Sequence, residues 1–148
     1  MSDGLYRLTY FSRNLIEGDD ELARAVADIV AASERNNRAA RVTGAFLVNK
    51  GCFGQILEGA LPAVEATFER IQQDERHGDV HLIELGPVDK RAFGSWSMTL
   101  AAPLSSTAEL LERSGLSSSF DPSRVSAGTM LDTLARLVKT RWAEPAVA

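Results

Sequence analysis

The chain has 148 residues, 45% of them hydrophobic and 24% charged, as expected for one globular domain with a substantial core. Its 16 basic and 20 acidic side chains give a net charge of -4, which argues against non-specific nucleic-acid binding. Because no apolar run approaches the roughly 20 residues of a membrane span, and the first residues do not begin a signal peptide, we expect a cytoplasmic protein.

The N-terminal half predicts a strand, a helix and a hairpin. Residues 5–12 alternate as a strand, and an acidic break then begins an amphipathic helix over 20–36. Residues 42–48 are apolar on both faces, as in a central strand. The turn signal at residues 49–51 returns a third strand beside it, over 52–59.

The next segment predicts another helix and two strands. Pro62 lies near the start of the helix, which runs to about Asp74. Strands follow at 80–88 and 95–101. The order β-α-β-β-α-β with an additional strand indicates an α+β fold, a ferredoxin-like sandwich with both helices on one sheet face.

Pro103 ends this unit, so we divide the chain into a domain at 1–103 and a C-terminal helical extension at 104–148. A capping box at 106–109 opens a short helix, and Asp121 opens a longer one. The longer helix has an apolar stripe, composed of Met130, Leu131, Leu134, Leu137, Val138 and Trp142. We expect these helices to pack on the uncovered face of the sheet.

One polar residue interrupts the third strand. Alternation places Gln55 on the same face as Phe53 and Leu57, with Gly54 and Ile56 on the other face. A primary amide has two donors and an acceptor, and leaving it unpaired in a core costs about 1–3 kcal/mol. We therefore expect a partner for Gln55, and the nature of that partner decides the function.

Other polar residues beside the apolar stripes each have a simple structural explanation. One of Asn36 and Asn37 would serve as a helix C-cap. Arg70 and Asp74 have the spacing of an exposed ion pair worth about 0.3–0.5 kcal/mol, and His77 that of a charge at a helix end.

The same residues also favour a shared ligand site. Tyr10 is explained as a core tyrosine, and Trp96 and Met98 as ordinary core. In the predicted fold, however, the ends of both helices would frame a slot above Tyr10 and Gln55. Amides, a guanidinium, a carboxylate and a phenol suit a flat heterocycle rich in imide and carbonyl groups. They suit hydrolysis poorly because no nucleophile is paired with a base, and one cysteine and two histidines leave little for a metal.

Six strings in order, with compatible spacing, carry a family resemblance: LYRLTYFS at 5–12, SERNN at 33–37, TG at 43–44, FGQILEG at 53–59, RIQQDERH at 70–77 and FGSWSM at 93–98. Together they resemble the BLUF family, blue-light sensors using flavin, over residues 5–102. The resemblance implies FAD held noncovalently between the two helices, with FMN and riboflavin as alternatives. The implied cofactor contacts are Ile29, Asn36, Asn37, Gln55, Arg70, Asp74 and His77, and no metal.

The resemblance also implies a photochemical switch. Tyr10 corresponds to the tyrosine that gives an electron to excited flavin, and Gln55 to the glutamine that passes the proton and then rotates or tautomerises. Trp96 and Met98 match the last-strand residues that report the light state and relay the signal. The cycle has no net reaction, so we expect a photosensory signalling protein and not an enzyme.

The expected output is a contact with another protein. Because nothing after residue 103 resembles a cyclase, a phosphodiesterase or a DNA-binding module, the chain resembles the short stand-alone members. We expect a downstream effector protein and a homo-oligomer, dimer or larger, with no nucleic acid or membrane partner. Two alternatives are a light-silent flavin- or partner-binding module of the same fold, and a small hydrolase such as an acylphosphatase. The hydrolase would need a glycine-rich anion loop that this chain lacks.

Overall fold

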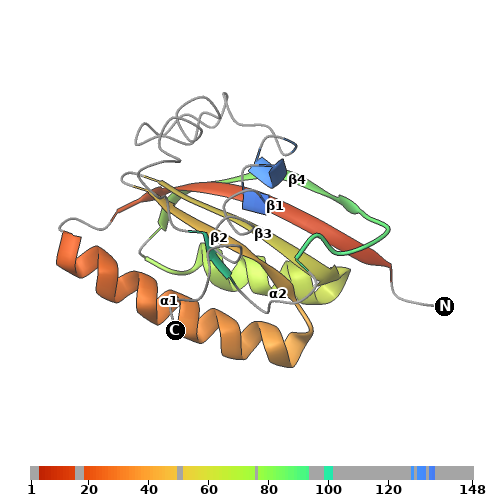
Figure 1. Ribbon diagram of the computed structural model, residues 1–148, viewed down its shortest axis with the longest axis horizontal. Coiled ribbons are helices and arrows are strands. Elements are labelled where there is room, and N and C mark those ends of the chain that lie inside the picture. The colour runs from red at the N-terminus through yellow and green to blue at the C-terminus, as the bar shows by residue number, and fades with distance from the viewer. Residues whose placement is uncertain are drawn as a thin grey trace, which may run out of the picture.

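A computed structural model describes residues 4–15, 19–49, 52–75, 77–93, 99–101, 128, 130–132 and 134–135. Within these ranges, one sheet is covered on one side by two helices (Figure 1). The elements in chain order are β1 (Leu5–Asn14), α1 (Asp19–Ala40), β2 (Thr43–Asn49), β3 (Cys52–Ala60), α2 (Leu61–Gln72), β4 (His77–Pro87) and β5 (Thr99–Ala101).

The sheet has the strand order β4-β1-β3-β2-β5. The first four strands are antiparallel to their neighbours, and β5 is parallel to β2. Each of the units β1-α1-β2 and β3-α2-β4 therefore skips one strand, with the skipped position filled by a strand of the other unit. This is the expected ferredoxin-like α+β fold with one extra strand.

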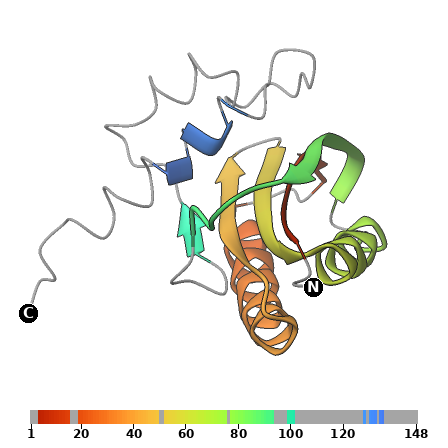
Figure 2. The same cartoon turned by 90° about the vertical axis from the view of Figure 1, so that its right-hand side faces the viewer.

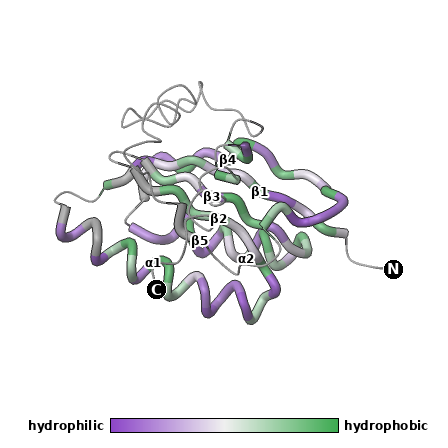
Figure 3. The backbone as a smooth tube through the Cα atoms, viewed as in Figure 1, coloured by the Kyte–Doolittle hydropathy of each residue, from purple (hydrophilic) through white to green (hydrophobic). Residues whose placement is uncertain are grey.

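The helices pack on the sheet through one apolar cluster. Its buried members are Leu8, Tyr10, Ile29, Val42, Phe46, Phe53, Leu57 and Val64. Hydrophilic and hydrophobic stretches alternate along α1 (Figure 3), as a helix with one buried face requires. The strand residues of this cluster alternate along β1 and β3, so the predicted face of Gln55 is confirmed.

A second cluster lies on the face of the sheet away from α1 and α2, on the side where Figure 2 shows the helical residues near the C-terminus. Its buried members are Phe11, Ala45, Leu47, Ile56, Phe93, Met130 and Leu134. Met130 and Leu134 belong to the helical residues near the C-terminus, so the expected packing of that stripe on the sheet is confirmed for these two side chains. The helix predicted to open at 106–109 lies outside the described residues.

The C-cap explanation of the two asparagines is wrong, because α1 continues past them to Ala40. The helix ends at Arg41, which has a positive φ of 59°. The amide of Val42 donates to the carbonyl of Asn37 at 2.8 Å, and that of Arg41 to the carbonyl of Arg38 at 3.3 Å. These two bonds form a Schellman motif, so the backbone itself closes the helix and no Asn side chain is needed there.

The assignment of His77 to a helix end is also wrong, because His77 begins β4 and pairs with Asn14 of β1. The last turn of α2 closes earlier, where the amides of Gln73 and Asp74 donate to the carbonyls of Arg70 and Ile71 at 3.2 and 3.0 Å. Pairing with β1 extends β4 back toward the end of α2, so that β4 begins at His77. Sequence periodicity does not report this effect, because strand pairing is a long-range contact.

The predicted return of the third strand beside the second is confirmed, since β2 and β3 are antiparallel neighbours with Asn49 opposite Cys52. The described part of the last strand is β5, so Trp96 and Met98 lie outside the described residues. Neither α1 nor α2 combines the length and apolar character needed to cross a membrane.

A buried carboxylate fastens the segment after β4 to the sheet. The side chain of Glu58 is fully buried and accepts hydrogen bonds from Arg7 Nε at 2.8 Å and from the backbone amides of Ala92 and Phe93 at 2.9 Å. Arg91 adds a bond to the Glu58 carbonyl at 2.9 Å. Three donors offset the cost of burying this charge, so Glu58 joins β1, β3 and the chain that leads toward β5.

Candidate functional site

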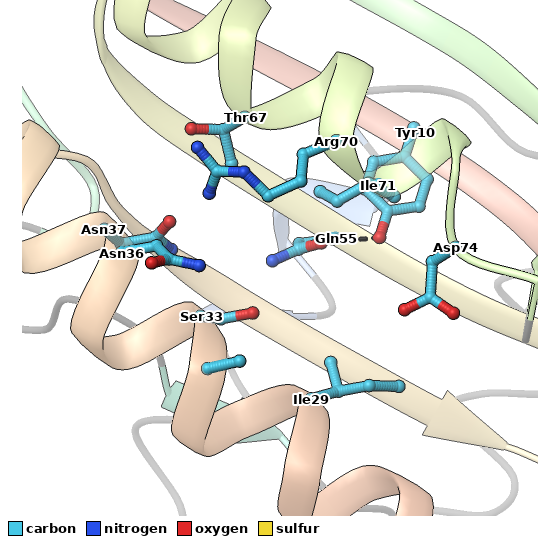
Figure 4. A pocket seen from close by; sticks show the side chains of 11 residues that line it. Tyr10, Ile29, Ser33, Asn36, Asn37, Gln55, Thr67, Arg70, Ile71 and Asp74 are labelled. Atoms are coloured by element: carbon cyan, nitrogen blue, oxygen red, sulfur yellow. Dashed lines mark hydrogen bonds between the residues drawn. The ribbon is translucent and has the colours of Figure 1, made fainter.

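A cavity lies between α1 and α2 above the sheet (Figure 4). Its empty volume, with the open mouth included, is about 500 Å³. The lining residues are Tyr10, Ile29, Ala32, Ser33, Asn36, Asn37, Gln55, Thr67, Arg70, Ile71 and Asp74. Two strands and two helices thus contribute to one site.

Tyr10 and Gln55 form the floor of this cavity. They stand opposite each other in the β1–β3 ladder, and the Tyr10 hydroxyl donates to Gln55 Oε1 at 2.5 Å. The Tyr10 side chain is 0% exposed and that of Gln55 2% exposed. Because Oε1 is turned toward the phenol, the amide nitrogen of Gln55 is turned toward the cavity (Figure 4). The expected partner of Gln55 is therefore Tyr10, which bonds the amide oxygen. The amide nitrogen is directed toward a ligand that would occupy the cavity.

The phenol of Tyr10 is held in its neutral form. Burial, together with the negative charge of Asp74, raises the pKa of Tyr10 far above its ordinary value of 10.0. The ring packs against Phe68 of α2 with centroids 5.5 Å apart. Tyr10 therefore keeps its proton at physiological pH and holds it on the bond to Gln55.

The α1 side of the cavity comes from one helical face. Ile29, Ser33 and Asn37 are four residues apart, and Asn36 lies beside them at the mouth. Ile29 is 8% exposed and Asn37 1% exposed, whereas Asn36 is exposed. The Oδ1 atom of Asn37 is buried and accepts no hydrogen bond within the described residues, although Asn37 makes other interactions. The Asn37 amide thus lines the cavity and is as buried as that of Gln55.

The α2 side carries the charged groups. Thr67, Ile71 and Arg70 lie within one turn of each other, and Asp74 follows. Figure 4 shows the guanidinium of Arg70 extending away from the Asp74 carboxylate. The exposed ion pair suggested by their spacing is therefore not the arrangement found, and both groups face the cavity instead.

Most of the predicted cofactor contacts meet at this cavity. Ile29, Asn36, Asn37, Gln55, Arg70 and Asp74 all line it, beside Tyr10. His77 is placed only as the first residue of β4, and its side chain lies outside the described part of the structure. Its contact with the cofactor remains a prediction, as do the relay roles of Trp96 and Met98.

Sequence reasoning did not select Thr67 as a site residue. Its hydroxyl donates to the carbonyl of Ala63 at 2.8 Å, one turn earlier in α2, and its side chain is buried. Its position three residues before Arg70, on the same helical face, is a signal that could have identified it. Ser33, which also lines the cavity, was noted only as the first residue of the SERNN string at 33–37.

The donor set fits a flat, polar heterocycle better than a metal. The amides of Asn36, Asn37 and Gln55 supply both donors and acceptors, while Ile29 and Ile71 supply apolar surface. Among the described residues, no group of histidine, cysteine and carboxylate side chains could hold a metal ion. An isoalloxazine ring has a pyrimidine edge with alternating carbonyl and N–H groups, which amides can pair with.

Comparison with known protein families agrees with this geometry. The model of the BLUF family, described as sensors of blue-light using FAD, matches residues 5–99, so the chain belongs to that family. The resemblance inferred from the six strings is thereby confirmed, together with FAD as the cofactor and blue light as the stimulus.

Individual relatives show where the similarity lies. Over 70 residues the chain is 37% identical to photoactivated adenylate cyclase subunit alpha of Euglena gracilis, covering 47% of this chain and 7% of that protein. Over 82 residues it is 33% identical to the blue light- and temperature-regulated antirepressor BluF of Escherichia coli (strain K12), covering 55% of this chain and 20% of that protein. The chain thus spans a fifth or less of these curated relatives.

A solved structure extends the similarity to nearly the whole chain. BlrB, a BLUF protein in its dark state, superposes with a TM-score of 0.76 at 29% identity. The superposition covers 95% of this chain and 99% of BlrB.

Proposed function

We propose that this protein is a blue-light photoreceptor in which the Tyr10–Gln55 hydrogen bond, beside bound FAD, is the switch that signals to a partner protein. The observation that carries this proposal is the 2.5 Å bond at the cavity floor, between a buried phenol and an amide whose nitrogen faces the cavity. A side chain with a donor at one end and an acceptor at the other can reverse its direction without leaving the core.

Different residues around the cavity would make the polar and the apolar contacts with FAD. Asn37 would pair with the polar edge of the ring, and Asn36 and Arg70 would bind its exposed side. Ile29 and Ile71 would enclose its faces, which excludes water and strengthens the polar contacts. Asp74 and His77 complete the proposed set.

When bound, FAD supplies absorption of blue light and an excited state that oxidises a nearby phenol. Tyr10 would then lose an electron, and its proton would move to Gln55 Oε1 along the existing bond. Gln55 can rotate by a half-turn, which directs its nitrogen toward Tyr10 and its oxygen toward the cavity. The electron taken from Tyr10 by the excited cofactor and the proton passed to Gln55 would both return to Tyr10, which restores the phenol. No net reaction remains, and the changed amide is the signal.

The output is proposed to be a protein contact. BlrB, which the chain covers almost completely, is a BLUF protein of similar extent, whereas the Euglena relative is a far longer cyclase subunit. We propose the same division as from sequence, a sensor at 1–103 and an extension at 104–148, with an effector protein or a second copy as partner. A complete 1:99 to 99:1 change would need about 5.5 kcal/mol, so a few altered hydrogen bonds produce a partial shift.

The first test is spectroscopic. The protein purified with FAD should be yellow, and blue light should shift its flavin band to the red, with recovery in the dark. The measurement is the visible absorption spectrum before, during and after illumination. Protein that binds FAD but shows no shift would favour the light-silent module of the same fold. Protein that cannot be loaded with FAD would contradict the photoreceptor and would leave a light-silent, partner-binding module of the same fold.

Asn37→Ala should weaken FAD binding about tenfold, which corresponds to about 1.4 kcal/mol and to the loss of one well-formed buried hydrogen-bond pair. The measurement is a titration of the apoprotein with FAD, followed by quenching of flavin fluorescence. Arg38→Ala is the matched control, because Arg38 is the next residue of α1 and its exposed guanidinium bonds Glu34 instead. Equal affinities of the two variants would show that Asn37 does not hold the ring.

A further inference from the structure

The sheet carries a second matched pair directly behind Tyr10 and Gln55. In the β1–β3 ladder the next positions place Phe11 opposite Gly54. Because successive residues of a strand face opposite sides, the first pair faces the cavity and the second faces away from it. The two clusters agree, since Tyr10 is buried among the helix residues and Phe11 is buried with Met130.

Met130 fills the space that Gly54 leaves by having no side chain. A Cβ on Gly54 would overlap the terminal methyl of Met130 and would lie 3.7 Å from Cδ1 of Phe11. Met130 is 0% exposed, so its methyl rests on the β3 backbone one residue from Gln55. We call this packing of Met130 on Gly54 and Phe11 the Met130 contact.

The position of β3 makes this contact sensitive to Gln55. Gly54 is paired with Phe11 of β1 and with Leu47 of β2, so the ladder restrains the strand within the plane of the sheet. If reversal of the Gln55 amide moves the β3 backbone, the movement is therefore perpendicular to the sheet, either toward the cavity or toward Met130. Closely packed contacts amplify such small shifts because they cannot deform continuously.

We propose that Met130 reads the state of Gln55 through the backbone of Gly54, so that light weakens the packing of the helical residues near Met130 on the sheet. This inference rests on the proposed Gln55 switch. It adds a route to the C-terminal extension that requires neither Trp96 nor Met98. This route is short, because Met130 packs on Gly54 and Gly54 is joined to Gln55 by one peptide bond.

The test is amide hydrogen exchange of the peptide covering residues 128–135, in FAD-loaded protein in the dark and under blue light. In the wild-type chain, light should raise exchange about fivefold, the lower end of coupling between sites in proteins. Met130→Ala should keep the red shift of the flavin band but lose this light dependence. Gly54→Ala, whose new methyl displaces that of Met130, should show the light-like exchange already in darkness.

Leu134→Ala is the matched control. Leu134 is one helical turn from Met130 and is equally buried in the same cluster. Its truncation should raise exchange in both states and keep the roughly fivefold ratio between light and dark, because the Met130 contact is intact.

The outcomes separate the two proposals. A wild-type red shift without a change in exchange, or an unchanged ratio in Met130→Ala, would overturn the Met130 contact and leave the photoreceptor standing. Absence of the red shift in the wild-type chain would overturn the proposed function itself, and the Met130 contact with it.

Discussion

Tyr10→Phe should leave FAD bound and abolish the light-induced red shift of the flavin band. The phenyl ring can keep its place beside Phe68, so the cavity retains its shape. The hydroxyl that donates to Gln55 Oε1 is removed, and a phenyl ring is a far poorer electron donor than a phenol. The measurement is the difference spectrum after an equal dose of blue light, with FAD occupancy matched between wild type and variant.

Tyr6→Phe is the control, because Tyr6 is the other tyrosine of the chain and lies on the same strand. Tyr6 stands opposite Gly59, is only partly buried and is not among the residues that line the cavity. The Tyr6 variant should show the full shift. A normal photocycle in Tyr10→Phe would refute Tyr10 as the donor.

Glu58→Ala should reduce the free energy of unfolding by about 3–5 kcal/mol, the usual cost of breaking a buried ion pair by removing one partner. The variant leaves Arg7 without its carboxylate and the buried amide of Phe93 without an acceptor. The measurement is urea unfolding with FAD at one fixed concentration, because bound ligand adds to the apparent stability.

Two variants place this result in context. Glu34→Ala removes an exposed partner of Arg38 in α1 and should cost less than about 0.5 kcal/mol. Glu58→Gln retains an acceptor but loses the charge, so its effect should lie between the other two. Equal stability of the Glu58→Ala and Glu34→Ala proteins would show that the buried carboxylate does not hold the segment after β4.

Most of the element order could be predicted because it depends on local periodicity. The apolar residues of α1 and α2 repeat at helical spacing, and those of β1 and β3 alternate. The odd position of Gln55 in β3 was visible for the same reason, because a single polar residue breaks an otherwise apolar face. Two stripes on two helices then predicted a shared slot once the βαββαβ order was recognised.

Both errors concern the end of a helix, which a backbone closure decides in one case and strand pairing in the other. Asn36 and Asn37 looked like the end of a helix, but the Schellman closure at Arg41 carries α1 a turn further and turns Asn37 into the cavity. His77 looked like a helix end, but pairing with β1 makes it the start of β4. The spacing of apolar residues near these positions predicts neither the end of α1 at Arg41 nor the start of β4 at His77.

The amino-acid sequence by itself determined the fold class, the family and most of the residues that line the cavity, because hydrophobic period and short motifs are local properties. Only the tertiary structure decided that Tyr10 donates to Gln55, that Arg70 turns from Asp74, and that Met130 rests behind Gln55 on Gly54. The two contacts, Tyr10 with Gln55 and Met130 with Gly54, join residues 45 and 76 positions apart in the sequence. Their geometry is set by strand register and side-chain packing, which exist only when the sheet and its two covering layers have formed.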